Sequence, residues 1–139
     1  MQKVIYAAKS LLRDYWNGGV PVLVKDMVSR IETIRVESDN IQSFRYDASK
    51  REHVFVVNES LPFRQQNIWL SECLGRYMLG YNATRPAIDA FINELLLPGI
   101  AIRKLVFVHE IADVEKLASM LQTSNANMLK RLKELGMIS

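Results

Sequence analysis

Hydrophobic residues recur at three- and four-residue steps along much of the chain, which predicts a fold made mainly of amphipathic helices. Prolines, glycines and small polar residues mark where these helices start and stop. The expected helices cover residues 2–16, a segment opened by Pro21, residues 62–81, residues 84–97 and two segments within residues 113–136. Residues 100–108 are strongly apolar and fit a strand as well as a helix; we favour a short helix there.

Alternating or continuous apolar runs predict strands in the first half of the chain. Residues 33–37 alternate, and residues 44–47 and 53–57 are expected to form a hairpin around the polar turn at 47–50. Residues 53–57 (HVFVV) give the strongest strand signal, because they are aromatic and β-branched and apolar on both faces. No linker or repeat divides the chain. We therefore expect a single α+β domain over residues 1–139, with a small, mostly antiparallel sheet packed with several helices.

The segment 113–136 predicts a helix–turn–helix-like arrangement. Thr123 or Ser124 is expected to cap its second helix, and Gly136 to end it. Side chains on the polar sides of this helix can read base edges or contact phosphates, or can contact a protein partner. These candidate contact residues are Asn125, Asn127, Lys130, Arg131 and Lys133. Any exposed amphipathic helix carries such residues, so packing or protein contact is the alternative that we favour over DNA binding.

Composition limits the class of protein. The chain has 139 residues, 49% of them hydrophobic and 24% charged, as in ordinary globular domains. A net charge of +3 is weak evidence for nucleic acid. A lone cysteine cannot form an internal disulfide, which favours a reducing compartment, and no apolar run is long enough to span a membrane. We expect a cytoplasmic protein without membrane contact.

Five pieces of the sequence, in order, resemble the ImmA/IrrE family of metallopeptidase-like proteins. These pieces are PVLV at 21–24, a strand that ends at Asn58, WLSECLGRYML at 69–79, DAFINELLLP at 89–98 and LASMLQTSNANMLKRLKELGMI at 117–138. The family's helix reads Ala-His-Glu-Leu-Gly-His-Tyr-Leu-Leu, and two of its histidines bind zinc. The resemblance implies a zincin-like central helix pair that cradles a cleft, with the C-terminal segment packed against this core.

The zinc ligands of that family are missing from this chain. Histidines four residues apart share a helix face and bind one metal, and the Glu between them acts as the base. The favoured alignment puts Glu72 and Arg76 at the histidine positions and Cys73 at the catalytic Glu; shifting it by one residue puts Ser71 and Gly75 there and keeps Glu72 as the Glu. Both alignments lose both histidines.

The third ligand of the family is also missing. Ala87 falls near its place, and Asp89 is the closest carboxylate. We therefore expect no catalytic residue, no metal and no cofactor. The former cleft would be marked by Glu72, Cys73, Arg76, Ala87 and Asp89.

Glu72 and Arg76 are four residues apart with the acid first, an arrangement that stabilises an exposed helix by about 0.2–0.5 kcal/mol. One hypothesis is that this ion pair fills the old zinc pocket and holds the two central helices together. The alternative is a solvated surface pair without a role, since exposed pairs contribute little.

Three functions remain as hypotheses. The first is a non-catalytic regulator that captures a protein partner, such as a phage or mobile-element repressor or a toxin. The second is a DNA-binding regulator that uses the C-terminal helix–turn–helix. The third is a peptidase with an altered site built on Glu72, Cys73 and Asp89, with His53 or His109 as a base.

Overall fold

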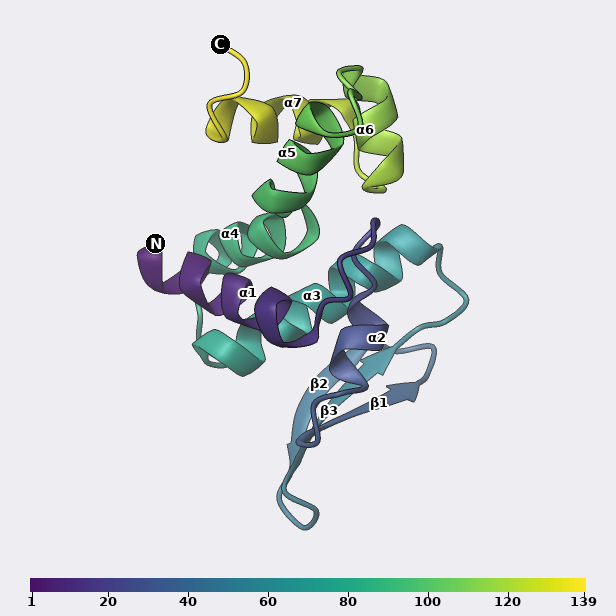
Figure 1. The fold of residues 1–139 in the computed structure, drawn as a ribbon. Helices are drawn as coiled ribbons and strands as arrows, with labels where there is room; N and C mark the ends of the chain where they lie inside the picture. The colour runs from purple at the N-terminus through teal and green to yellow at the C-terminus, as the bar shows by residue number, and fades with distance from the viewer.

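A computed structural model describes residues 1–139 and shows helices packed on one small sheet. The elements are α1 (Gln2–Tyr15), α2 (Val24–Val28), β1 (Ile34–Ser38), β2 (Ser43–Asp47), β3 (Glu52–Val57), α3 (Phe63–Leu79), α4 (Arg85–Leu96), α5 (Gly99–Phe107), α6 (Val114–Met120) and α7 (Asn125–Glu134). The sheet lies at one end of the molecule, α1, α3 and α4 lie in the middle, and α5–α7 lie at the other end (Figure 1). The predicted α+β class is confirmed, and the ambiguous segment 100–108 is helical over most of its length.

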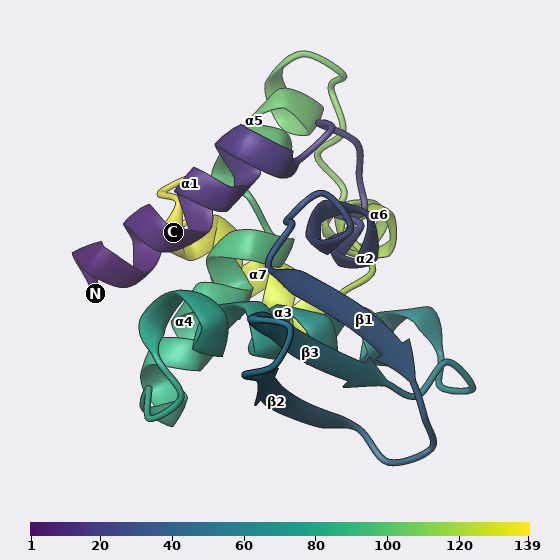
Figure 2. The same cartoon turned by 90° about the horizontal axis from the view of Figure 1, so that it is seen from below.

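The sheet is mixed, where we expected mostly antiparallel pairing. Its strand order is β1-β3-β2; β2 and β3 form the predicted antiparallel hairpin, whereas β1 pairs with β3 in parallel. The central place of β3 follows from its burial, because four consecutive residues, Val54 to Val57, are buried. A strand that is apolar on both faces is buried best in the centre. Because β1 and β2 run in opposite directions, a strand between them must be parallel to one of them (Figure 2).

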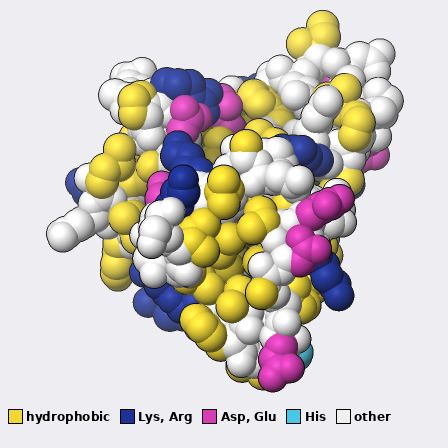
Figure 3. All heavy atoms as spheres, turned by 90° about the horizontal axis from the view of Figure 1, so that it is seen from above, with side chains coloured by type: hydrophobic (Ala, Val, Ile, Leu, Met, Phe, Trp, Pro, Cys, Tyr) yellow, Lys and Arg dark blue, Asp and Glu magenta, His cyan; other side chains and the backbone are white.

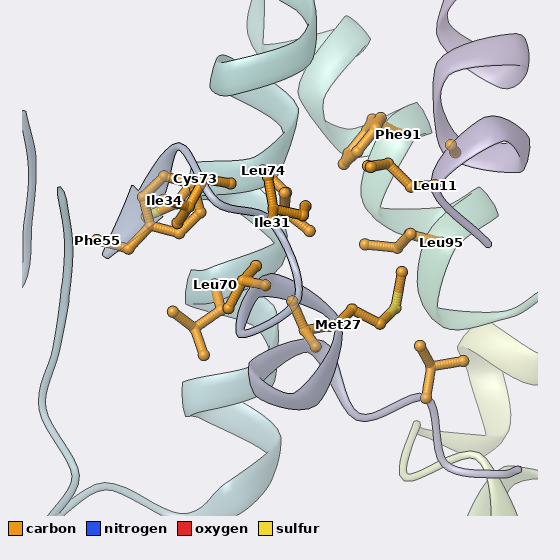
Figure 4. Close-up of a cluster of buried hydrophobic side chains, with 14 of the residues drawn as sticks. Leu11, Met27, Ile31, Ile34, Phe55, Leu70, Cys73, Leu74, Phe91 and Leu95 are labelled. Atoms are coloured by element: carbon orange, nitrogen blue, oxygen red, sulfur yellow. The ribbon is translucent and has the colours of Figure 1, made fainter. Parts of the chain in front are cut away.

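The main hydrophobic core joins the sheet to α1–α4 through 18 buried residues. Figure 4 shows how side chains from different elements converge in it, among them Leu11 of α1, Met27 of α2 and Leu74 of α3. Gly75 sets the approach of α4 to α3, because a Cβ added there would lie 3.0 Å from both Ile88 and Phe91. Such a distance is tighter than most Cβ contacts, so a larger residue would require Ile88 and Phe91 to shift by a few tenths of an ångström.

The three C-terminal helices form a second, smaller core of eight buried residues. The predicted helix–turn–helix-like pair is present as α6 and α7. The Asp113 carboxylate accepts a hydrogen bond from the Glu115 N–H, and the Ser124 hydroxyl accepts one from the Asn127 N–H, so both helices start at a capping side chain. Gly136 follows α7 with a φ of +71°, a conformation that favours glycine at the end of a helix.

A buried arginine joins this C-terminal unit to α4. The guanidinium of Arg131 forms two parallel hydrogen bonds with the Glu94 carboxylate, at 3.2 and 3.1 Å, and its Nε donates to the Leu97 carbonyl oxygen at 2.9 Å. Only 5% of the Arg131 side chain is exposed. The expectation that Arg131 projects from the polar side of its helix is therefore wrong: its guanidinium fork satisfies two acceptors inside the fold.

Replacing Arg131 should destabilise the fold strongly. Arg131→Met keeps most of the apolar stem but leaves the Glu94 carboxylate without its partner, so we expect a loss of about 3–5 kcal/mol in the free energy of unfolding. Urea denaturation followed by circular dichroism measures this loss. The double variant Glu94→Leu/Arg131→Met removes both charges and should recover much of it. A loss below about 1 kcal/mol for the single variant, the range of an exposed ion pair, would contradict the structural role of Arg131.

Candidate functional site

A groove of about 520 Å³ lies between the central helices and the corner where α6 turns into α7. This volume is typical of ligand pockets, which span about 300–1,000 Å³. α3 and α4 form one wall, and residues 121–123 with α7 form the other; we call it the α4–α7 groove. Its charged and amide side chains include Arg64, Glu72, Arg85, Asp89, Asn93, Asn127, Lys130 and Glu134.

The structure separates the five residues predicted for the former cleft. Glu72 and Asp89 line the α4–α7 groove. Arg76 does not; its Nη1 donates to the Tyr81 carbonyl oxygen at 3.0 Å, where α3 ends. Ala87 is half-buried against the main core, and Cys73 is fully buried within it. The two carboxylates therefore share one groove, and the other three side chains lie outside it.

An ion-pair network connects α3 to α4 along this wall. The Glu72 carboxylate forms ion pairs with Arg76 at 3.5 Å and with Arg85 at 3.0 Å. Arg85 also pairs with Asp89 at 3.0 Å. The hydrogen bond to Glu72 raises the pKa of Arg85 above its ordinary value. The link between the helices thus runs mainly through Arg85, which the sequence reasoning missed. Half of the Arg85 side chain is exposed, so each pair contributes at most about 1 kcal/mol.

The candidate contact residues of the C-terminal helix do not share one surface either. Asn127 and Lys130 line the α4–α7 groove opposite Glu72 and Asp89. Asn125 and Lys133 are exposed and lie outside it, while Arg131 is buried. Since α7 turns about 100° per residue, neighbouring positions must face different ways. The structure therefore brings part of the predicted cleft and part of the predicted contact surface together in one groove.

Two cations of the groove have no acidic partner. Glu72 and Asp89 pair with Arg76 and Arg85, whereas Glu134 lies 3.8 Å from Arg131, whose guanidinium is already held by Glu94. The remaining two cations, Arg64 of α3 and Lys130 of α7, take part in none of the ion pairs of the structure. They stand on opposite walls. No sequence signal distinguished Arg64, because its role depends on the distant segment that faces it.

The environment of Cys73 does not suit a nucleophile. Its thiol is fully buried, and this burial raises its pKa well above the ordinary range, so the reactive thiolate is disfavoured. His53 hydrogen-bonds the Tyr81 hydroxyl through Nδ1 at 3.0 Å and packs edge-on against Tyr77, and burial lowers its pKa. His109 is exposed in the segment after α5. No group of three or more His, Cys, Asp and Glu side chains is placed to hold a metal ion.

Comparison with known proteins assigns no family: no family model, no curated protein and no solved structure matches the chain. None of the helices has the length and the apolar character needed to cross a membrane.

Cys73 should be inert toward thiol reagents in the folded protein. Full burial blocks access and the raised pKa removes the thiolate, so Ellman's reagent should react with native protein only as fast as the core opens. The same protein in concentrated guanidinium should release one equivalent of chromophore per chain at once. Rapid stoichiometric labelling under native conditions would contradict this environment and would favour the altered-site hypothesis.

Proposed function

We propose that this chain is a non-catalytic regulatory protein that binds a partner protein in the α4–α7 groove. One observation carries the proposal. Two carboxylates predicted for a former active-site cleft, Glu72 and Asp89, share a groove with two predicted contact residues, Asn127 and Lys130. These residues come from two distant parts of the sequence, so the groove is formed by the tertiary fold and not by one local segment.

The charges of the groove support recognition of a partner. Glu72 and Asp89 are already paired within the fold, whereas Arg64 and Lys130 are free to pair with groups of a ligand. Free cations on both walls favour a segment that carries carboxylates, because complementary charge directs both encounter and register. Binding of this kind shifts the partner between its states by mass action and needs no chemical step.

The proposal includes an origin in an ImmA/IrrE-like scaffold. In that reading α3 is the former metal-binding helix, and Glu72 occupies one of its ligand positions. The partner class that the resemblance implies is a repressor or toxin encoded by a phage or mobile element. We place this activity in the cytoplasm, which the single free cysteine supports.

DNA binding through α6 and α7 is the competing function. Asn125 and Lys133 are exposed on α7 and are free to contact a duplex. Asn127 and Lys130, however, line the concave α4–α7 groove. Duplex recognition places a helix inside the major groove, which requires side chains that project from a convex surface. The groove therefore favours a protein ligand.

A paired-variant capture experiment tests the proposal. Arg64→Glu/Lys130→Glu reverses both free cations of the groove, and Lys3→Glu/Lys116→Glu makes the same change of net charge at exposed residues that line neither wall. Wild-type protein and the control double variant should retain the same protein from a lysate of the source cells, and the groove variant should lose it. The purified partner should then bind the wild-type chain in calorimetry and keep its intact mass after incubation.

Two results would contradict the proposal. Cleavage of the partner by the purified wild-type chain would show a catalytic protein. Tight binding of a duplex oligonucleotide, with a steep salt dependence and loss of binding in Lys130→Glu/Lys133→Glu, would favour the DNA-binding function.

A further inference from the structure

A second cavity, of about 540 Å³, lies between α1 and the start of α5, away from the α4–α7 groove. The two cavities share no lining residue. Its apolar wall is formed by Leu12 of α1, by Trp16 directly after α1, and by Pro98, Ile100 and Leu135 from the C-terminal unit. We call it the α1–α5 groove.

The rim of the α1–α5 groove is cationic. Lys9 and Arg13 of α1 and Arg103 of α5 line it, and neither Lys9 nor Arg103 takes part in an ion pair. Arg13 pairs only with its exposed neighbour Asp14, at 3.0 Å. The one carboxylate in the lining, Glu94, is neutralised by the buried guanidinium of Arg131.

Two positive charges lie close together on α1. Lys9 and Arg13 are four residues apart, so they share one face of the helix and repel each other. An anionic ligand in the groove would turn this repulsion into attraction. The electrostatics of the rim therefore favour an occupant with carboxylates on its flanks.

The exposed apolar surface continues along α5 beyond the cavity. Ile100 at the cavity and Phe107 at the far end of the helix are 71% and 70% exposed. Phe107 comes seven positions after Ile100, so the two lie on the same side of α5, about 10 Å apart along its axis, with Arg103 near the same line. This length matches about two turns of a helix. The view from above shows hydrophobic side chains gathered in the middle of that face, with both basic and acidic side chains around them (Figure 3).

We propose that the α1–α5 groove is a docking site for an acidic amphipathic helix of a partner protein. Apolar side chains of that helix, spaced three or four residues apart, would cover Trp16 and Ile100 and continue toward Phe107. Its flanking carboxylates would lie against Lys9 and Arg103. This is the helix-in-groove mode of recognition, in which the apolar face supplies affinity and the flanking charges supply orientation.

The two tryptophans of the chain provide a reporter and an internal control. Trp16 lines the α1–α5 groove, whereas Trp69 lies on α3 and donates its indole N–H to the Val56 carbonyl oxygen of β3 at 2.9 Å. The probe is a synthetic helix of about 18 residues with leucines at i, i+4, i+7 and i+11 and glutamates beside them. In ¹H–¹⁵N spectra it should move the Trp16 indole resonance progressively and leave that of Trp69 in place.

Charge variants test the rim. Lys9→Glu/Arg103→Glu should weaken binding of the acidic peptide about tenfold, because two attractions become repulsions, whereas Lys3→Glu/Lys116→Glu should change it much less. Ile100→Ser should weaken it as well, and as a surface substitution it should leave the fold intact. These variants leave Arg64 and Lys130 unchanged, so failure here is distinguishable from failure of the function proposed for the α4–α7 groove.

Three outcomes would overturn the inference. A lysine-for-glutamate version of the peptide that moves Trp16 equally would remove the role of charge. Sodium decanoate that moves Trp16 and displaces the peptide would identify a site for small amphipathic anions. Self-association in sedimentation analysis that Lys9→Glu/Arg103→Glu abolishes would identify a second copy of the chain as the occupant.

Discussion

The buried contact between Arg131 and α4 is the interaction on which the arrangement of this protein depends. Two hydrophobic cores form separately, one around α3 and the sheet and one among α5–α7. Arg131 joins them, because its guanidinium satisfies both the Glu94 carboxylate and the Leu97 carbonyl oxygen. A buried ion pair of this kind adds little net stability over an apolar contact, but its geometry is directional. It therefore fixes how the C-terminal unit is oriented against the central helices.

Both candidate binding surfaces follow from that orientation. With α7 held against the end of α4, Asn127 and Lys130 face Glu72 and Asp89 across one groove. On the other side the same contact supports the wall formed by Pro98, Ile100 and Leu135, which faces α1. Glu72, Asp89 and Glu94 are paired within the fold, and each groove keeps two cations without an acidic partner: Arg64 and Lys130 in one, Lys9 and Arg103 in the other. The proposed function is thus binding directed by charge on a rigid frame.

The features that could be predicted from the sequence are those set by local periodicity and capping. The helices, the hairpin of β2 and β3 and the Ser124 cap follow from spacing within one segment. The parallel pairing of β1 with β3 could not be predicted in this way, since it depends on competition among three strands for the central place. The burial of Arg131 was equally hidden, because its partners lie 37 and 34 residues away and helical periodicity alone places it among polar neighbours. The candidate site was predicted in part: Glu72, Asp89, Asn127 and Lys130 meet, whereas Arg64 and Arg85 acquire their roles only from tertiary contacts.

The central claim is that Arg131 makes the two cores one rigid body, so that the α4–α7 groove is a permanent feature of the free protein. Residual dipolar couplings of backbone amides in weakly aligned medium test this claim most directly. A single alignment tensor should fit the couplings of α3 and α4 together with those of α6 and α7. Two tensors of different magnitude would show that the C-terminal unit moves independently, and the groove would then be no fixed binding site.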